Sequence, residues 1–178
     1  MRIVDIVSKV NQIKPSKEEL SNRIEDADYV DYLLDSYTID INDIDPKLSL
    51  IENLVLHTSF GSIDFAGITF NGVLEDLAVK ETRLKVFAVF QENQLCYNGS
   101  LDRFYYIDLY DPNNHPIVVQ CDLIQDKFME ALLYLMGLDI RFTYKDIPIG
   151  PDSSEELARI AGHPDYKRFF DIVLSQYE

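Results

Sequence analysis

The first part of the chain repeats apolar residues with the period of a helix. Four of them at helical spacing predict an amphipathic helix, namely Ile3, Val7, Val10 and Ile13. Pro15 ends this helix because proline cannot continue the hydrogen-bond ladder. Ser16 and Glu19 then match the capping-box pattern that begins a second helix.

The next stretch predicts a helix with one apolar face and one acidic face. Its apolar positions follow the spacing i, i+3, i+4 and i+7, at Val30, Leu33, Leu34 and Tyr37. The opposite face carries Asp28, Asp31 and Asp35, with Tyr32 beside them. No Lys or Arg offsets the acids between Glu25 and Asp45.

From about Leu54 the pattern changes to the alternation of β-strands. In SFGSIDFAGITFNGVL the apolar phase slips at Ala66–Gly67, where we expect a β-bulge to absorb an extra residue. LKVFAVF, from Leu84 to Phe90, predicts a buried strand. Asn98–Gly99 predicts a hairpin between QLCY and RFYYIDLY, and Asp111–Pro112–Asn113–Asn114 predicts a turn before PIVVQC.

Helical spacing returns near the C-terminal end. It first appears at Phe128, Leu132, Leu135 and Met136 in a helix that we expect Gly137 to close. An extended piece, DIRFTYKDIPIG, follows. Ser153 and Glu156 predict the cap of another helix, and Pro164 begins a last one.

Helices, then a meander of strands, then helices predict an α+β fold, an antiparallel β-sheet of about 5–6 strands flanked by N-terminal and C-terminal helices. The 178 residues suit one hydrophobic core, so we expect a single domain spanning 1–178. An appended helical lobe is the alternative for residues 139–178.

Charge narrows the classes of partner. The chain has 31 acids and 16 bases, which gives a formal net charge of −15. Such a field repels nucleic acid and anionic lipid and favours a basic protein partner. The alternative is that the acidity only keeps the protein soluble.

We expect a cytoplasmic location without membrane contact. The N-terminal sequence MRIVDIVSKVNQIK lacks the apolar core and cleavage site of a signal peptide, and no apolar run is long enough to span a bilayer. Cys96 and Cys121 lie in strand-like surroundings, which favours reduced thiols in a core over a disulfide framework.

No motif assembles catalytic or metal chemistry, so we predict no catalytic residue, no metal and no cofactor. His57, His115 and His163 lack metal-ligand spacing, and the GxSxG, GxGxxG and Walker A patterns are missing. A calcium loop starting at Asp40 would place Ile44 at the fifth position and Asp45 at the glycine position, which favours a solvated linker between helix and sheet. A hydrolase that uses a pair among the many carboxylates stays open.

Four segments in order carry a resemblance to a known family: SFGSIDF, KVFAVF, FYYIDLYDPNNHPIVV and KFMEALLYLM. Together, from about residue 58 to 137, they resemble the SUKH superfamily, whose bacterial members largely act as immunity proteins against polymorphic toxins. The chain departs from that pattern at Ser62 and at Asn113–Asn114, where glycine is common, and its last forty residues have no counterpart.

The resemblance implies a sheet wrapped by helices and a non-catalytic function, the neutralisation of a basic cognate toxin, such as a nuclease, by direct binding. Under that hypothesis the candidate contact residues are Asp28, Asp31, Tyr32 and Asp35, or a loop with Glu75, Asp76 and Glu81. Ordinary solvated surface is the alternative for both sets. An intracellular adaptor or regulatory domain that binds a basic protein is the competing function.

Overall fold

The computed structural model describes residues 1–79, 81–99, 103–107, 117–119 and 125–177. Four helices precede the sheet: α1 (Ile3–Ile13), α2 (Lys17–Ser21), α3 (Ala27–Ser36) and α4 (Leu50–Leu56). Three follow it: α5 (Gln125–Lys145), α6 (Ser153–Ala161) and α7 (Lys167–Leu174). Single 3-10 turns are η1 (Phe60–Ser62), η2 (Pro164–Tyr166) and η3 (Ser175–Tyr177).

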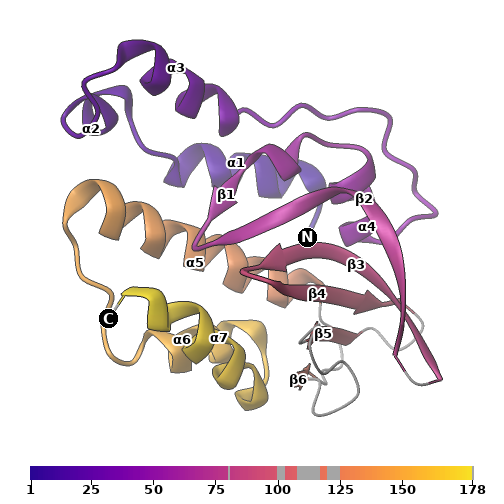
Figure 1. Cartoon of the computed structure of the whole chain (residues 1–178). Helices are drawn as coiled ribbons and strands as arrows, with labels where there is room; N and C mark the ends of the chain where they lie inside the picture. The colour runs from indigo at the N-terminus through magenta and orange to yellow at the C-terminus, as the bar shows by residue number, and fades with distance from the viewer. Residues whose placement is uncertain (80, 100–102, 108–116, 120–124, 178) are drawn as a thin grey trace.

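Between these helices lies one antiparallel sheet (Figure 1). Among the described residues its strands are β1 (Asp64–Phe65), β2 (Ile68–Val79), β3 (Thr82–Phe90), β4 (Asn93–Asn98), β5 (Arg103–Ile107) and β6 (Ile117–Val119). Each strand pairs with the next in sequence, so the sheet is a simple meander. The predicted α+β class and the flanking helices are confirmed.

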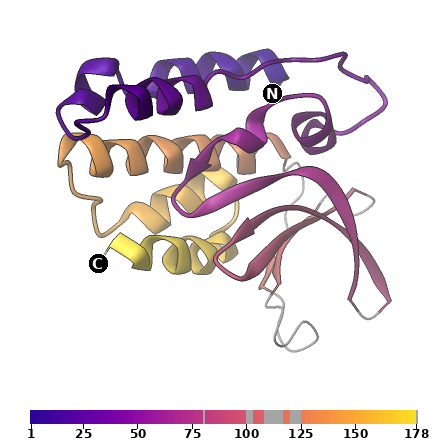
Figure 2. The same ribbon diagram turned by 45° about the horizontal axis from the view of Figure 1, so that its top comes forward.

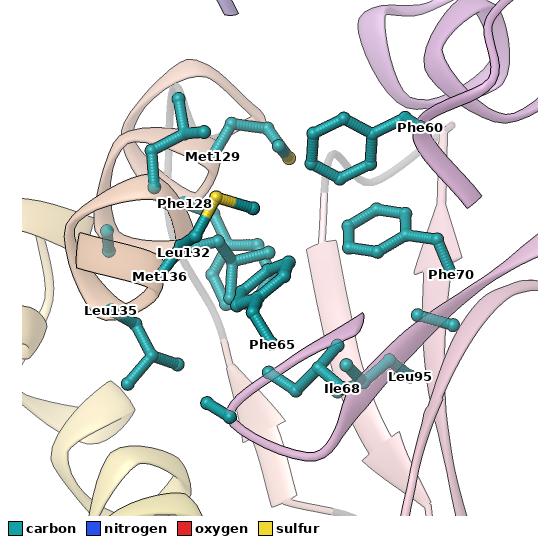
Figure 3. Close-up of a cluster of buried hydrophobic side chains, with 14 of the residues drawn as sticks. Phe60, Phe65, Ile68, Phe70, Leu95, Phe128, Met129, Leu132, Leu135 and Met136 are labelled. Atoms are coloured by element: carbon teal, nitrogen blue, oxygen red, sulfur yellow. The ribbon is translucent and has the colours of Figure 1, made fainter. Parts of the chain in front are cut away.

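The main core lies between the sheet and α5. Figure 3 shows side chains of η1 and the strands, including Phe60, Phe65 and Phe70, facing Phe128 and Leu132 of α5. All five are at most 3% exposed. Aromatic contacts continue through this layer, and the Phe104 and Phe128 rings stack with centroids 4.4 Å apart. The sheet therefore depends on α5 for the cover of one face.

Helix α5 also contacts the other two groups of helices. In Figures 1 and 2 it lies between α1 and the pair α6–α7, and its buried residues cover more than half of its circumference. A helix with so wide an apolar sector packs against several neighbours at once. The helices on its two sides therefore form two separate outer surfaces.

The N-terminal helices follow the sequence predictions. Helix α1 ends at Ile13, just before Pro15, and Ser16 and Glu19 make both hydrogen bonds of the predicted capping box. Helix α4 is a further helix that the prediction missed. It begins with the same pattern, since the Ser49 hydroxyl accepts from the Glu52 N–H and the Glu52 carboxylate accepts from the Ser49 N–H.

The predicted bulge at Ala66–Gly67 is wrong. These two residues form the turn between β1 and β2, with Phe65 paired to Ile68 and φ values of 50° and 68°. Positive φ at both turn positions matches the twist of a tight hairpin. The irregularity in β2 lies further on, between Phe70 and Glu75, where the register against β3 shifts.

The predicted end of the central helix at Gly137 is also wrong. Helix α5 continues to Lys145, so DIRFTYK is helical, and the five residues after it, 146–150, form neither helix nor strand. Glycine costs about 1 kcal/mol in a helix, but Leu138 and Ile140 are 6% and 1% exposed. Burial of two large side chains outweighs that cost.

The C-terminal helices differ from the prediction only in the residues at which they begin. Ser153 is the first residue of α6 rather than its cap, because Asp152 occupies the cap position. Gly162 ends α6 with φ of 90°, and Pro164 begins η2, which leads into α7.

The strands predicted between Leu84 and Ile107 are present in the structure as β3, β4 and β5. β4 and β5 pair as the predicted hairpin requires, but Asn98 is the last residue of β4, paired with Arg103, and residues 100–102 lie outside the described residues. Ile117–Val119 form β6. Cys96 is fully buried in a second cluster with Val86 and Leu84, and this burial raises the pKa of its thiol to about 12. The turn from Asp111 to Asn114, His115 and Cys121 lie outside the described residues.

Replacing Gly137 with alanine should raise the free energy of unfolding by about 1 kcal/mol, because alanine is the better helix former. The added methyl group would lie 3.9 Å from Ile13 Cγ2, an ordinary contact. Gly162→Ala should have the opposite effect and lower the free energy of unfolding. Gly162 has a positive φ, and the added methyl group would lie 2.8 Å from Lys127 Cδ. Urea denaturation that showed Gly137→Ala to be destabilising would contradict the assignment of residue 137 to a helix interior.

Candidate functional site

Helix α3 is held in a fixed orientation by its cap and its apolar face. The Asp26 carboxylate accepts hydrogen bonds from the N–H groups of Asp28 and Tyr29 at 3.0 and 3.1 Å. On the inner side, Val30 is 1% exposed and Tyr37 is 5% exposed. The remaining face of the helix therefore points to solvent.

The outward face of α3 carries all four residues predicted from the sequence. Asp28, Asp31, Tyr32 and Asp35 are each exposed. Lys17 pairs with Asp31. Within the described part of the chain, Asp28 and Asp35 form no ion pair, so their charges are not neutralised locally.

Tyr29 also belongs to this face, and the sequence prediction missed it. Its ring stacks on that of Tyr32, with centroids 6.0 Å apart and an angle of 16° between the planes. The two side chains are 50% and 65% exposed. Their spacing of three residues on a helix could have revealed the pair.

The acidic stretch continues beyond α3 in a linker that leads to α4, not directly to the sheet as predicted. Ser59 fixes this linker, because its hydroxyl accepts from the Asp40 N–H at 2.8 Å and its N–H donates to the Asp40 carbonyl at 3.1 Å. Asp40 and Asp43 are exposed, and Ile41 and Ile44 are each 41% exposed.

Both segments lie on the α1 side of α5 in Figures 1 and 2. We call their outward residues the acidic surface: Asp28, Tyr29, Asp31, Tyr32, Asp35, Asp40 and Asp43. Nowhere in the described residues do three or more His, Cys, Asp or Glu side chains gather as a metal site would require. The carboxylates of the acidic surface come from two successive segments of the chain, α3 and the linker that follows it.

The second predicted set is not a loop. Glu75 and Asp76 lie in β2, paired with Val86 and Lys85, and only Glu81 lies in the turn before β3. All three are exposed, and Lys85 Nζ lies 3.0 Å from an Asp76 carboxylate oxygen. This ion pair leaves less unbalanced charge here than on the acidic surface.

Two carboxylates on different elements, Asp64 of β1 and Asp139 of α5, come near each other. Desolvation, and to a lesser degree the Asp139 charge, raises the pKa of Asp64. Asp139 itself accepts from the Ala66 N–H at 3.0 Å and from the Tyr177 hydroxyl at 2.6 Å. Burial and this bond raise the pKa of Tyr177, which keeps the phenol protonated as the donor.

These bonds give Asp139 a structural role, because it joins α5 to the β1–β2 turn and to η3. Gln176 supports the same junction by donating from Nε2 to the Ala66 carbonyl at 2.7 Å. Each oxygen of Asp139 accepts one of these hydrogen bonds, so the carboxylate is fixed in place within this junction.

The histidines that the structure describes also have structural positions. His57 ends α4, and its carbonyl accepts from the Asn42 N–H at 2.8 Å. His163 precedes η2, where its Nδ1 accepts from the Asp165 N–H at 3.2 Å.

The chain matches no family model, no curated protein and no solved structure. Among the described residues, no helix has both the length and the apolar character that crossing a membrane requires.

Replacing Asp139 with asparagine should lower the free energy of unfolding by roughly 1–2 kcal/mol, because the amide cannot accept both hydrogen bonds that the carboxylate accepts. Asp152→Asn is the control, since Asp152 is exposed and its side chain makes no cap bond. That change should stay within about 0.5 kcal/mol in urea denaturation. Equal stability of the two variants would contradict the structural role of Asp139.

Proposed function

We propose that the protein is a non-catalytic binding protein that recognises a basic protein partner through the acidic surface. The observation that carries this proposal is the exposed, stacked pair Tyr29–Tyr32 beside the unpaired carboxylates of Asp28 and Asp35. Aromatic side chains are enriched in protein interfaces, where polar and charged groups lie at the rim.

Charge and aromatic rings contribute to binding in different ways. The net charge of −15 attracts a cationic partner over distances beyond contact and raises the association rate. The tyrosines supply apolar area that becomes buried on contact, together with hydroxyl groups for hydrogen bonds. Charge therefore acts mainly on the association rate, and the tyrosines act mainly on the dissociation rate.

The proposed role is that of a cytoplasmic immunity or antitoxin-like protein, as the SUKH resemblance implies. A basic toxin, for example a nuclease, would present the cationic surface with which it binds its substrate. An acidic protein bound there would exclude the nucleic acid. Support comes from the α+β architecture and from the charge of the acidic surface, and the role involves no membrane and no nucleic acid ligand.

An adaptor or regulatory domain would use the same surface for a basic partner that is not toxic. A growth assay distinguishes the two functions. If the chain is an immunity protein, production of its partner alone should stop the growth of the host cell, and co-production of this chain should restore growth. The partner of an adaptor should not stop growth.

A hydrolase is the weaker alternative, because the acid pair that could have served it, Asp64 and Asp139, includes a carboxylate that holds the fold together.

The double variant Asp28→Lys/Asp35→Lys should bind the partner with an association rate at least about tenfold lower at low salt, because it reverses charge where no ion pair compensates. Both side chains are exposed and the Asp26 cap is untouched, so the helix should remain folded. The measurement is capture from the native host with quantitative mass spectrometry, followed by surface plasmon resonance with the purified partner.

The matched control is Asp152→Lys/Glu155→Lys at the start of α6, which changes the net charge equally on the other side of α5. This control should lower the association rate far less. Equal rates for the two double variants at low salt would remove the acidic surface from the interface.

The substitution Tyr32→Ala should mainly raise the dissociation rate of the complex, with a loss of about 2 kcal/mol in binding, the range of an aromatic anchor. The stability of the free protein should change little, because the side chain is 65% exposed. Leu56→Ala, a 45% exposed apolar side chain on α4, serves as the control. An unchanged dissociation rate for Tyr32→Ala would show that the tyrosine pair is not an anchor.

A further inference from the structure

A cationic hollow lies on the side of α5 away from the acidic surface. It measures about 640 Å³ and lies among the start of α5, the end of α6 and the start of α7. Lys127, Arg159, His163 and Lys167 line it, with Glu155 as the one carboxylate among the lining residues. Three of the chain's 16 Lys and Arg residues thus converge here, although acids outnumber bases about two to one overall.

The fold of the α6 end brings these groups together. Gly162 N–H donates to the Arg159 carbonyl and His163 N–H donates to the Ala158 carbonyl, the two bonds of a Schellman motif. The stem of Lys127 lies over Gly162, since an added Cβ there would be 2.8 Å from Lys127 Cδ. Because Gly162 has no side chain, Lys127 has room to reach the hollow.

Internal contacts use only part of this positive charge. Among the described residues Lys127 has no ion pair, and Arg159 pairs only with Glu156, at 3.6 Å and with a 75% exposed side chain. Lys167 is neutralised in part by Asp171 at 3.0 Å. The Schellman bonds already satisfy the carbonyls of Ala158 and Arg159, so the cations are not needed as their hydrogen-bond partners.

His163 adds a donor. Its Nδ1 accepts from the Asp165 N–H, so the neutral ring carries its proton on Nε2. Lys127 also lies in the first turn of α5, a 21-residue helix whose N–H groups make that end positive. An anion in the hollow would meet ammonium, guanidinium and imidazole donors from three elements.

We propose that this hollow binds a small organic phosphate, a phosphomonoester. Its volume is in the range of small-molecule sites. Ala158 and Pro164 provide an apolar wall for the organic part. Lys127, which has no ion pair among the described residues, can pair with a phosphate oxygen, and the guanidinium fork of Arg159 matches two such oxygens. Salt screens the distant acids of α3, because their field fades over about 8 Å at physiological ionic strength.

The test is calorimetric titration of the full chain with inorganic phosphate, glycerol 2-phosphate and succinate, with ionic strength held equal by sodium chloride. Both phosphates should bind at millimolar concentration or tighter, and succinate should bind at least roughly tenfold more weakly. The variants Lys127→Gln and Arg159→Gln should each weaken phosphate binding by roughly tenfold.

Arg168→Gln is the matched control, because Arg168 is an exposed cation on α7 next to Lys167 but does not line the hollow. Its affinity for phosphate should equal that of the unaltered chain, and circular dichroism should show all three variants folded. Absence of binding, equal affinity for succinate, or an equal loss in Arg168→Gln would each overturn the proposal.

Discussion

The burial of α5 against the sheet, α1 and α6 is the constraint on which the rest of the structure depends. Phe128 and Leu132 cover the sheet, and the opposite sides of the helix receive α1 and α6. Each large side chain removed from water there contributes about 2–3 kcal/mol. Since the helix cannot turn without exposing one of these surfaces, it fixes where the outer helices lie, and with them the acidic surface and the cationic hollow.

Among the described residues, some acids hold the fold together and others only face solvent. Glu19, Glu52 and Asp26 cap helices, and Asp139 holds the junction of α5, the first hairpin and η3. Their replacement would cost stability through lost hydrogen bonds. On the acidic surface Asp31 pairs with Lys17, but the exposed carboxylates of Asp28 and Asp35 form no ion pair among the described residues, which favours a role in recognition over a role in folding.

Sequence patterns predicted the features that depend on neighbouring residues. The Ser16–Glu19 cap, the α3 stripe and strand Leu84–Phe90 involve short spacings, and the structure confirms them. The slip at Ala66–Gly67 fits a bulge or a tight turn equally well, and only the pairing of Phe65 with Ile68 decides. A glycine such as Gly137 often ends a helix, and only the tertiary burial of Leu138 and Ile140 shows that this helix continues. The hollow joins Lys127 to Lys167, forty residues apart, which no local pattern can predict.

The separation of the acidic surface from the cationic hollow by α5 has a consequence for how the molecule moves. Acids without any base from Glu25 to Asp45 on one side, and a mixture of acids and bases in α6 and α7 on the other, contribute to an electric dipole moment along that axis. A dipole in the field of a basic protein experiences a torque. The chain would rotate during approach until α3 faces that protein and α7 faces away, so orientation is selected before the first contact.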